Sequence, residues 1–188
     1  MSSFREYNHV QPAVFLDRDG TLIEDRGHLR EPSDVVFFPH TAKALKSLGV
    51  HYQLFIVTHQ PGVAKGLISP DNVLRVNNHI VTVLAEAGVR IADVYCCFHL
   101  PSDNCPCIKP KPYFLLKAAE DYSLDLQRSF VIGDHPHDVA LARNAGACGI
   151  YVLSGHGAKH RTELSEKTVV LPGILEAATW ILNKPPNG

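Results

Sequence analysis

The sequence predicts an α/β fold with one parallel sheet, and two observations support this class. Short apolar segments rich in Val, Ile and Phe alternate along the chain with longer segments that have helical spacing and end in glycine. Such alternation is typical of βαβ units, whose strands are parallel and whose crossovers are right-handed. Three apolar segments also end in polar residues, as expected of an open parallel sheet that binds a ligand beyond its strand ends.

The predicted elements begin with a strand at 14–16 and a helix at 41–49. The near-continuous apolar run at 52–58 predicts a strand covered on both faces. Ser69 is the expected N-cap of a helix at 69–88, with Pro70 at its first position. The later elements are predicted in the order strand 91–98, helix 111–123, strand 129–134, helix 137–146, strand 148–153 and helix 172–182, with a loose tail at 183–188.

Composition points to one globular domain over residues 1–188. The chain is 45% hydrophobic and 20% charged, with a net charge of -1. It has no basic stripe, so we expect no nucleic-acid partner. It has neither a signal-peptide pattern nor an apolar run long enough to span a membrane. We therefore expect a cytoplasmic monomer that acts on a small molecule.

Acidic residues follow the predicted strands at the edge where ligands bind. Asp17 and Asp19 follow the first strand, and Asp134 follows the strand at 129–134. These carboxylates, with Asp138, would repel one another unless a cation joined them, and a site of few carboxylates suits Mg²⁺. Thr58 ends another strand, and Lys109 precedes a helix at the same depth.

This set of residues predicts phosphoryl chemistry. Asp17 can attack phosphorus to form an aspartyl-phosphate, and Asp19 can serve as general acid and then general base. Thr58 can bind a phosphoryl oxygen, and Lys109 can neutralise charge. Each feature alone has an ordinary explanation, such as a turn, a surface lysine or a helix cap. Their combination, in this order, favours a phosphatase.

The four motifs resemble those of the haloacid dehalogenase superfamily of phosphohydrolases. They are D-R-D-G-T at 17–21, Thr58, Lys109 and G-D-x-x-x-D at 133–138, and the resemblance extends from about residue 13 to 182. It implies a Rossmann-like, doubly wound sheet, with Mg²⁺ held by Asp17, Asp134 and the backbone carbonyl of Asp19, and Asp138 in the outer shell. The short segments between the motifs imply a capless member.

A cysteine-rich loop, C-F-H-L-P-S-D-N-C-P-C at 97–107, predicts a structural zinc site. Cys97, His99, Cys105 and Cys107 provide three thiolates and an imidazole, a usual closed zinc set. The alternative is a reduced loop without metal. We expect the zinc to shape the loop that carries Lys109, while Cys96 and Cys148 are expected to be buried, apolar in character and not ligands.

The arrangement C-x-H…C-x-C-x-K-P resembles two related families, the D-glycero-D-manno-heptose-1,7-bisphosphate phosphatases of lipopolysaccharide precursor synthesis and the histidinol-phosphatases. T-H-Q-P-G-V-A-K-G at 58–66 favours the former, whereas the short zinc loop favours the latter. The longer similarity outweighs one loop length, so we expect a heptose bisphosphate phosphatase, with histidinol-phosphatase as the alternative. His59 and Ile108 depart from the usual asparagine and arginine of these families. The residues expected to contact substrate are Gly20, Thr21, His59, Gln60 and Lys111.

Two functions of other classes stay open at this point. A phosphomutase would use the same aspartates, usually under a cap that excludes water. A non-catalytic, zinc-stabilised binding module would keep the cysteines without needing Asp17, Asp19, Lys109 and Asp134 together. Magnesium-dependent phosphate release from an aryl phosphate would separate an enzyme from such a module.

Overall fold

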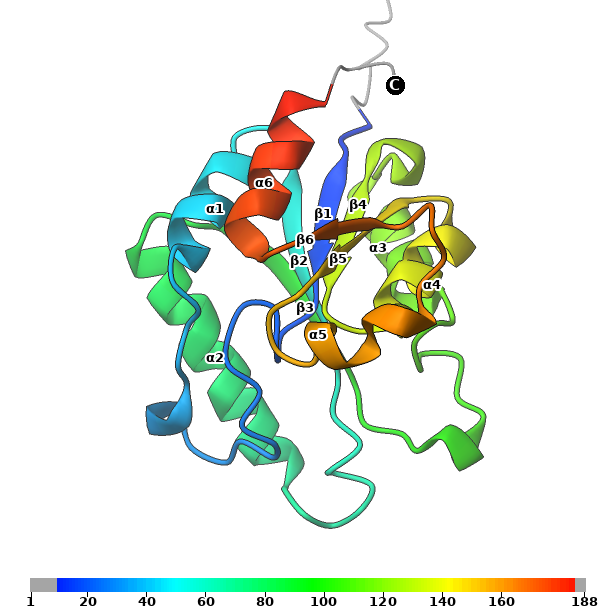
Figure 1. Ribbon diagram of the computed structural model, residues 1–188. Coiled ribbons are helices and arrows are strands. Elements are labelled where there is room, and N and C mark those ends of the chain that lie inside the picture. Colours follow the sequence, from blue (N-terminus) through cyan, green and yellow to red (C-terminus); the bar gives the residue numbers. More distant parts are fainter. Residues whose placement is uncertain (1–9, 185–188) are drawn as a thin grey trace, which may run out of the picture.

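A parallel sheet forms the centre of the computed structural model, which describes residues 10–184 (Figure 1). Within this range the strand order is β3-β2-β1-β4-β5-β6, and every paired strand runs parallel to its neighbour. The predicted parallel α/β sheet is therefore confirmed. The strands are β1 (Ala13–Leu16), β2 (Gln53–His59), β3 (Ile91–Cys97), β4 (Phe130–Gly133), β5 (Cys148–Val152) and β6 (Val169–Leu171).

The sheet is doubly wound around β1. From β1 the chain proceeds outward to β2 and β3, then returns to the other side of β1 and proceeds through β4 and β5 to β6. The direction of winding reverses between β1 and β4. In open α/β sheets a ligand crevice lies at such a switch point, outside the carboxyl ends of the strands.

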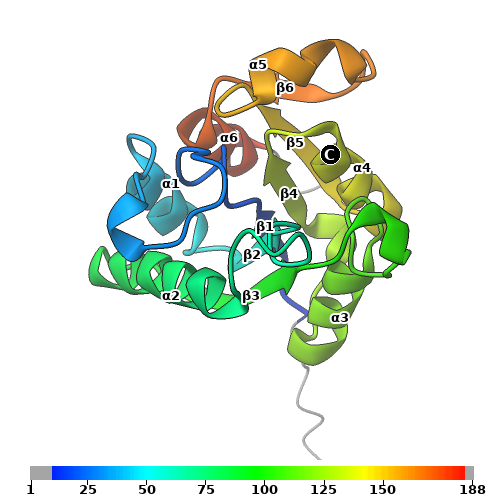
Figure 2. The ribbon, with the colours of Figure 1, turned by 90° about the horizontal axis from the view of Figure 1, so that it is seen from below.

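Helices cover both faces of the sheet (Figure 2). One layer contains α1 (Thr41–Leu48), α2 (Pro70–Glu86) and α6 (Ile174–Asn183), and the other contains α3 (Tyr113–Tyr122) and α4 (Pro136–Ala145). Side chains alternate between the two faces of a strand. In β1, Val14 and Leu16 pack toward the first layer while Ala13 and Phe15 pack toward the second. This two-sided burial explains why the sequence of β1 is continuously apolar.

The predicted helix caps and boundaries agree closely with the structure. The side chain of Ser69 accepts a hydrogen bond from the backbone N–H of Asn72 at 3.1 Å, so its role as the N-cap of α2 is confirmed. The sequence pattern missed β6 and the short helix α5 (Gly157–His160), because neither is long enough to show a period. The predicted loose tail begins too early, since Asn183 still belongs to α6; residues 185–188 lie outside the described range.

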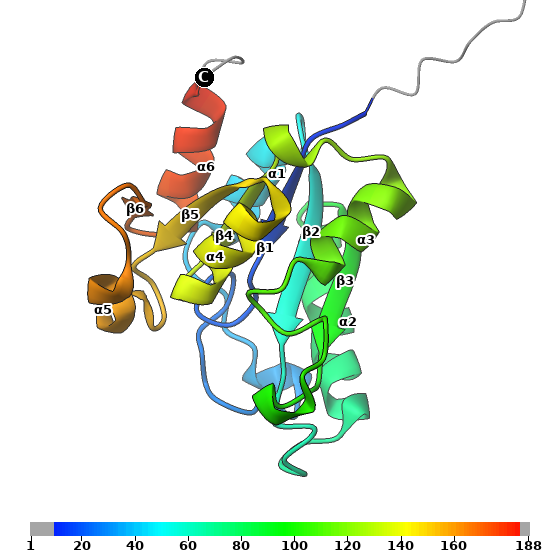
Figure 3. The ribbon, with the colours of Figure 1, turned by 90° about the vertical axis from the view of Figure 1, so that its right-hand side faces the viewer.

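Loops rather than a folded cap lie beside the carboxyl ends of the first strands (Figures 1 and 3). The segment after β1 contains a short 3-10 helix, Pro32–Asp34, and the segment after β3 contains another, Pro101–Asp103. Both loops therefore lie at the same edge of the sheet as the switch point. None of the helices within residues 10–184 combines the length and the hydropathy needed to cross a membrane.

Candidate active site and metal sites

Asp17 stands at the switch point, and Lys109 joins it to Asp138 of α4. The residue follows β1 directly, and its backbone N–H donates to the carbonyl of Ile132 in β4 at 2.9 Å. The Lys109 ammonium lies 2.6 Å from Asp17 Oδ1 and 2.7 Å from Asp138 Oδ1. Only 10% of the Lys109 side chain is exposed, so its ammonium group is buried among the residues of the site.

Three carboxylates converge beside this lysine. Oxygen atoms of Asp17, Asp134 and Asp138 all lie within 4.8 Å of one another. The approach of Asp134 requires glycine at position 20, where φ is +80° and where a Cβ would overlap the Asp134 carboxylate. The glycine of the D-x-D-G motif therefore makes room for the third carboxylate, which the sequence alone did not indicate.

The electrostatics of this group call for a cation. Burial raises the pKa of Asp17 well above its ordinary value; Lys109 opposes this rise, whereas the neighbouring Asp138 and Asp134 add to it. Burial likewise raises the pKa of Asp134 to about 6. For Lys109, burial lowers the pKa, but Asp138 and Asp17 outweigh it and the pKa lies above the ordinary value. Ionised carboxylates at this spacing are stabilised by a divalent ion, and their all-oxygen donor set fits Mg²⁺.

The Asp19 side chain does not belong to the group of three carboxylates and is held by a buried arginine. Arg18, only 1% exposed, contacts Asp19 through Nε at 2.9 Å and Nη2 at 2.8 Å, and donates through Nη1 to Asn77 of α2 at 2.7 Å. Burial raises the pKa of Asp19 and the Arg18 charge opposes that rise. Arg18 and Asn77 were missed from the sequence, although a charged residue flanked by two motif aspartates was a signal.

Gln60 links Asp19 to the second strand. Its side-chain amide donates to Asp19 Oδ2 at 2.7 Å and to Thr58 Oγ1 at 2.9 Å. The Gln60 residue is 5% exposed and does not line the cavity. Gln60 therefore holds Asp19 and Thr58, and its predicted substrate contact stays a prediction.

A cavity of about 260 Å³ opens above these groups. The predicted residues Asp17, Asp19, Thr58, Lys109 and Asp134 line it, as do Asp138 and His59. Four further residues line the cavity that the sequence analysis did not assign to the site: two fall within the motif at 133–138, and the other two lie outside the motifs. These are Asp25, His135, His137 and His156.

Two other predicted substrate contacts, Thr21 and Lys111, do not line the cavity, and their contact with substrate stays a prediction. Thr21 is fully buried, its hydroxyl has no hydrogen-bond partner among residues 10–184, and it does not line the cavity. The Lys111 ammonium donates to the backbone carbonyls of Asn104 and Cys105, both at 3.1 Å, and to Asn104 Oδ1 at 2.8 Å. Lys111 therefore braces the cysteine-rich loop. Ile108, half-buried, is likewise absent from the cavity lining.

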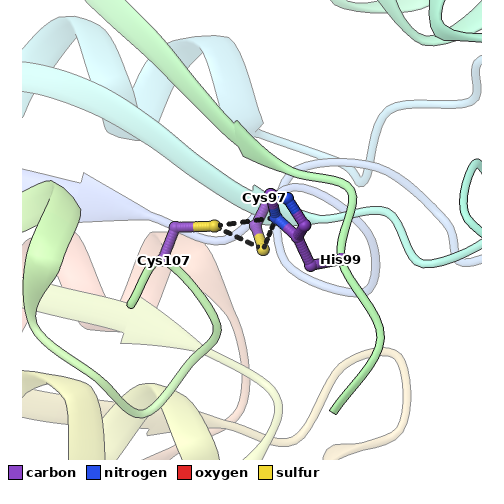
Figure 4. A group of neighbouring side chains, drawn as sticks. All are labelled: Cys97, His99 and Cys107. Carbon is purple, nitrogen blue, oxygen red and sulfur yellow. Dashed lines mark hydrogen bonds between the residues drawn. The ribbon is translucent and has the colours of Figure 1, made fainter. Parts of the chain in front are cut away.

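The cysteine-rich loop brings soft ligands together (Figure 4). Cys107 Sγ lies 2.8 Å from Cys97 Sγ and 3.3 Å from His99 Nδ1, and Cys97 Sγ lies 3.8 Å from the same nitrogen. A tetrahedral zinc ion spaces such donors by about 3.5–3.8 Å. Cys105 Sγ contacts Cys107 Sγ at 3.1 Å but lies outside the mutual group of three. The donor types are those of a zinc site, but both sulfur–sulfur distances are shorter than the spacing around a bound ion, and Cys105 stands outside the group of three.

The other two cysteines lie apart from this group. Cys96 points to the opposite side of β3, is half-buried, and has a pKa raised to about 12 chiefly by burial, with Arg18 opposing. Cys148 is also only partly buried, against the core side of β5, so neither cysteine is as buried as expected. Helix α5 begins at Gly157, and the residue before it, His156, lines the cavity.

The fold and this group of residues define a phosphohydrolase of the haloacid dehalogenase class. A family model described as HAD-hydrolase-like matches residues 106–177. The D-glycero-beta-D-manno-heptose-1,7-bisphosphate 7-phosphatase of Photorhabdus laumondii is 36% identical over 165 residues, covering 82% of this chain and 86% of the relative. The enzyme of the same name from Yersinia pestis is 34% identical over 184 residues, covering 92% of this chain and 90% of the relative.

A solved structure that is similar to this chain is also of a heptose bisphosphate phosphatase. The D,D-heptose 1,7-bisphosphate phosphatase of B. bronchiseptica, crystallised with magnesium and phosphate, matches with a TM-score of 0.86 at 27% identity, covering 93% of this chain and 100% of that chain. The chain belongs to the family of HAD-like phosphatases that contains these heptose bisphosphate 7-phosphatases. It is an enzyme that hydrolyses phosphoric monoesters.

Proposed function

We propose that the chain removes the 7-phosphate of D-glycero-D-manno-heptose 1,7-bisphosphate, in a reaction that requires Mg²⁺ and takes place during synthesis of surface-glycan precursors. The observation that carries the chemistry is the contact between Asp17 Oδ1 and Lys109 Nζ at 2.6 Å, beside the carboxylates of Asp134 and Asp138. The names of the relatives support the choice of substrate. The expected cytoplasmic location and monomeric state stay predictions.

Asp17 is the proposed nucleophile. Its carboxylate attacks the phosphorus atom, and the bond to the leaving alcohol oxygen breaks as an aspartyl-phosphate forms. Lys109 holds one oxygen of Asp17, so the other carboxylate oxygen can face the substrate. The hydroxyl of Thr58 lines the same cavity and can donate a hydrogen bond to a phosphoryl oxygen.

Asp19 is the proposed general acid and base. In its protonated form it donates a proton to the leaving alcohol, and the resulting carboxylate then takes a proton from the water that hydrolyses the aspartyl-phosphate. Burial raises the pKa of Asp19, which increases the protonated fraction near neutral pH. Arg18 and Gln60 hold both carboxylate oxygens, so the side chain is oriented before substrate arrives.

Two metals are part of the proposal. Asp17 and Asp134, with the backbone carbonyl of Asp19, would hold Mg²⁺, and Asp138 would act from the outer shell because Lys109 and the His135 backbone N–H occupy its oxygens. Bound Mg²⁺ would neutralise charge on the phosphate and carboxylates. Zinc, held by Cys97, His99, Cys105 and Cys107, would be structural and would stabilise the loop before Lys109.

A phosphate-release assay tests the proposal. The purified protein, supplied with MgCl₂, is given heptose 1,7-bisphosphate, histidinol phosphate and p-nitrophenyl phosphate in parallel. We expect the highest kcat/KM with the heptose bisphosphate and loss of activity with all three when Mg²⁺ is omitted. Preference for histidinol phosphate would transfer the assignment to the related histidinol-phosphatases, and inactivity with every substrate would favour the non-catalytic module.

A further inference from the structure

Asn77 is a buried polar residue on the apolar face of α2. The buried residues of this helix are Val73, Val76, Asn77, Ile80 and Leu84, a spacing that forms one stripe along the helix. Asn77 is 6% exposed, and the other four members are hydrophobic core residues. A buried amide costs free energy unless it is hydrogen-bonded, and an apolar side chain would avoid that cost. Packing alone therefore does not explain asparagine at position 77.

The hydrogen-bond partner of Asn77 is Arg18, which stands between the two motif aspartates. Arg18 Nη1 donates to Asn77 Oδ1 at 2.7 Å. A guanidinium group has donors only, so the amide oxygen must face it. Both residues are buried, and neither lines the cavity above the carboxylates. Any part that Arg18 and Asn77 take in the reaction must therefore pass through a neighbouring residue.

That neighbour is Asp19. Arg18 Nε donates to Asp19 Oδ2 at 2.9 Å, and Nη2 donates to Oδ1 at 3.0 Å, so two hydrogen bonds join the guanidinium to the carboxylate. The bond from Nη1 to Asn77 is a third contact, and it fixes the guanidinium on the side away from Asp19. The direction of the Asp19 carboxylate therefore depends on a residue of α2 that is distant in sequence.

Stability is a poor explanation for these contacts. Apolar residues of similar volume often stabilise a fold as well as a buried ion pair does. Apolar residues cannot, however, fix the direction of a carboxylate that must meet first a leaving oxygen and then a water molecule. We propose that Asn77 is a positioning residue for the general acid and base: through Arg18 it holds Asp19 in the orientation that proton transfer requires. The assignment rests on the proposed phosphatase function.

The experiment compares leaving groups that differ in their need for a proton. The alcohol oxygen of heptose 1,7-bisphosphate or of glucose 6-phosphate must be protonated as it departs, whereas p-nitrophenolate is a stable anion that departs without a proton. Because kcat/KM reports the steps up to this departure, it depends on Asp19 as an acid only with the two sugar phosphates.

Two variants of Asn77 are compared with wild type. Asn77→Leu removes the acceptor, whereas Asn77→Asp keeps an acceptor oxygen for Arg18. The matched control is Asn78→Leu, which makes the same change at the next residue of α2, where the side chain is exposed. Thermal unfolding of each variant checks that the fold is retained, and Asn77→Ala replaces Asn77→Leu if the latter does not fold.

For Asn77→Leu we expect kcat/KM to fall about 10- to 100-fold on the sugar phosphates, as for a misplaced proton donor, and less than about threefold on p-nitrophenyl phosphate. Asn77→Asp should recover most of the loss, and Asn78→Leu should match wild type. Equal losses on all substrates would overturn the assignment, as would unchanged kinetics in Asn77→Leu or a failure of Asn77→Asp to recover activity. An inactive wild type on p-nitrophenyl phosphate would instead overturn the phosphatase function on which the assignment rests.

Discussion

His59 Nε2 lies 2.7 Å from the backbone carbonyl oxygen of His99, which ties the end of β2 to the cysteine-rich loop. The two strands meet at the same level, because His59 pairs with Cys97 in the register of β2 and β3. Gln60 adds a backbone hydrogen bond to the Cys97 carbonyl at 2.7 Å. The strand that carries Thr58 and the loop that carries Lys109 are therefore held as one unit.

The first prediction tests this link. Replacing His59 by Phe removes the donor, whereas His59→Gln keeps a donor at similar reach. We expect His59→Phe to release zinc to a chelator severalfold faster than wild type and to lower kcat, because structural zinc binding is coupled to folding of its loop. His59→Gln should restore most of both properties. Identical zinc-release rates for the two variants, measured with a zinc-sensitive dye, would refute the link.

The second prediction concerns the two motif aspartates. Asp17→Asn should abolish turnover, because an amide cannot form the acyl-phosphate. Asp19→Asn should lower kcat by roughly 10²–10⁴-fold, the usual contribution of a positioned acid or base. Single-turnover assays on p-nitrophenyl phosphate distinguish the two, since phosphate should become bound to the protein only where Asp17 is intact. Wild-type activity in Asp17→Asn would show that another residue is the nucleophile.

The third prediction concerns the buried Arg18. Arg18→Met removes one partner of a buried ion pair, so that Asp19 keeps only the Gln60 donor and Asn77 Oδ1 loses its donor. Such losses cost about 3–5 kcal/mol of unfolding free energy. The matched control is Arg128→Met, which removes an arginine that is 62% exposed and has one ion pair at 3.9 Å. We expect that control to change stability by less than about 0.5 kcal/mol in urea titrations; comparable losses in both variants would contradict the structural role of Arg18.

The fourth prediction concerns pH and magnesium. Burial raises the pKa of Asp17 well above its ordinary value and that of Asp134 to about 6. A raised pKa in the folded state adds stability below the ordinary pKa of aspartate, and this contribution is lost as pH rises through the folded value. The metal-free protein should therefore be destabilised by ionisation near neutral pH, and Mg²⁺, which binds the ionised form, should offset that loss.

The measurement is the thermal midpoint with MgCl₂ and with NaCl of equal ionic strength, without a chelator that would remove zinc. We expect the stabilisation by Mg²⁺ to be larger at about pH 7.5 than at about pH 5. Asp134→Asn should remove most of the difference, because it lacks one of the ionised ligands. A magnesium-induced shift that is the same at both pH values would argue against a carboxylate site with raised pKa values.

Much of the site could be predicted because its residues follow strands. An apolar strand has a recognisable local pattern, and parallel strands end at the same edge of their sheet. The positions of Asp17, Thr58 and Asp134 were therefore readable without coordinates, and the structure brings all three to one cavity. The soft ligands Cys97, His99 and Cys107 were readable for a similar reason, because they are close in sequence and meet within one loop.

The sequence by itself determined the alternation of strands and helices, the strand-end carboxylates and the group of cysteine and histidine donors, since each depends on residues near one another along the chain. Only the tertiary structure decided which loops meet across the sheet. It buried Arg18 against Asn77, directed Lys111 into its own loop, sealed Thr21 in the interior and brought His156 to Asp25. These arrangements depend on the packing of segments far apart in the sequence, and neither hydrophobic periodicity nor motif spacing contains that information.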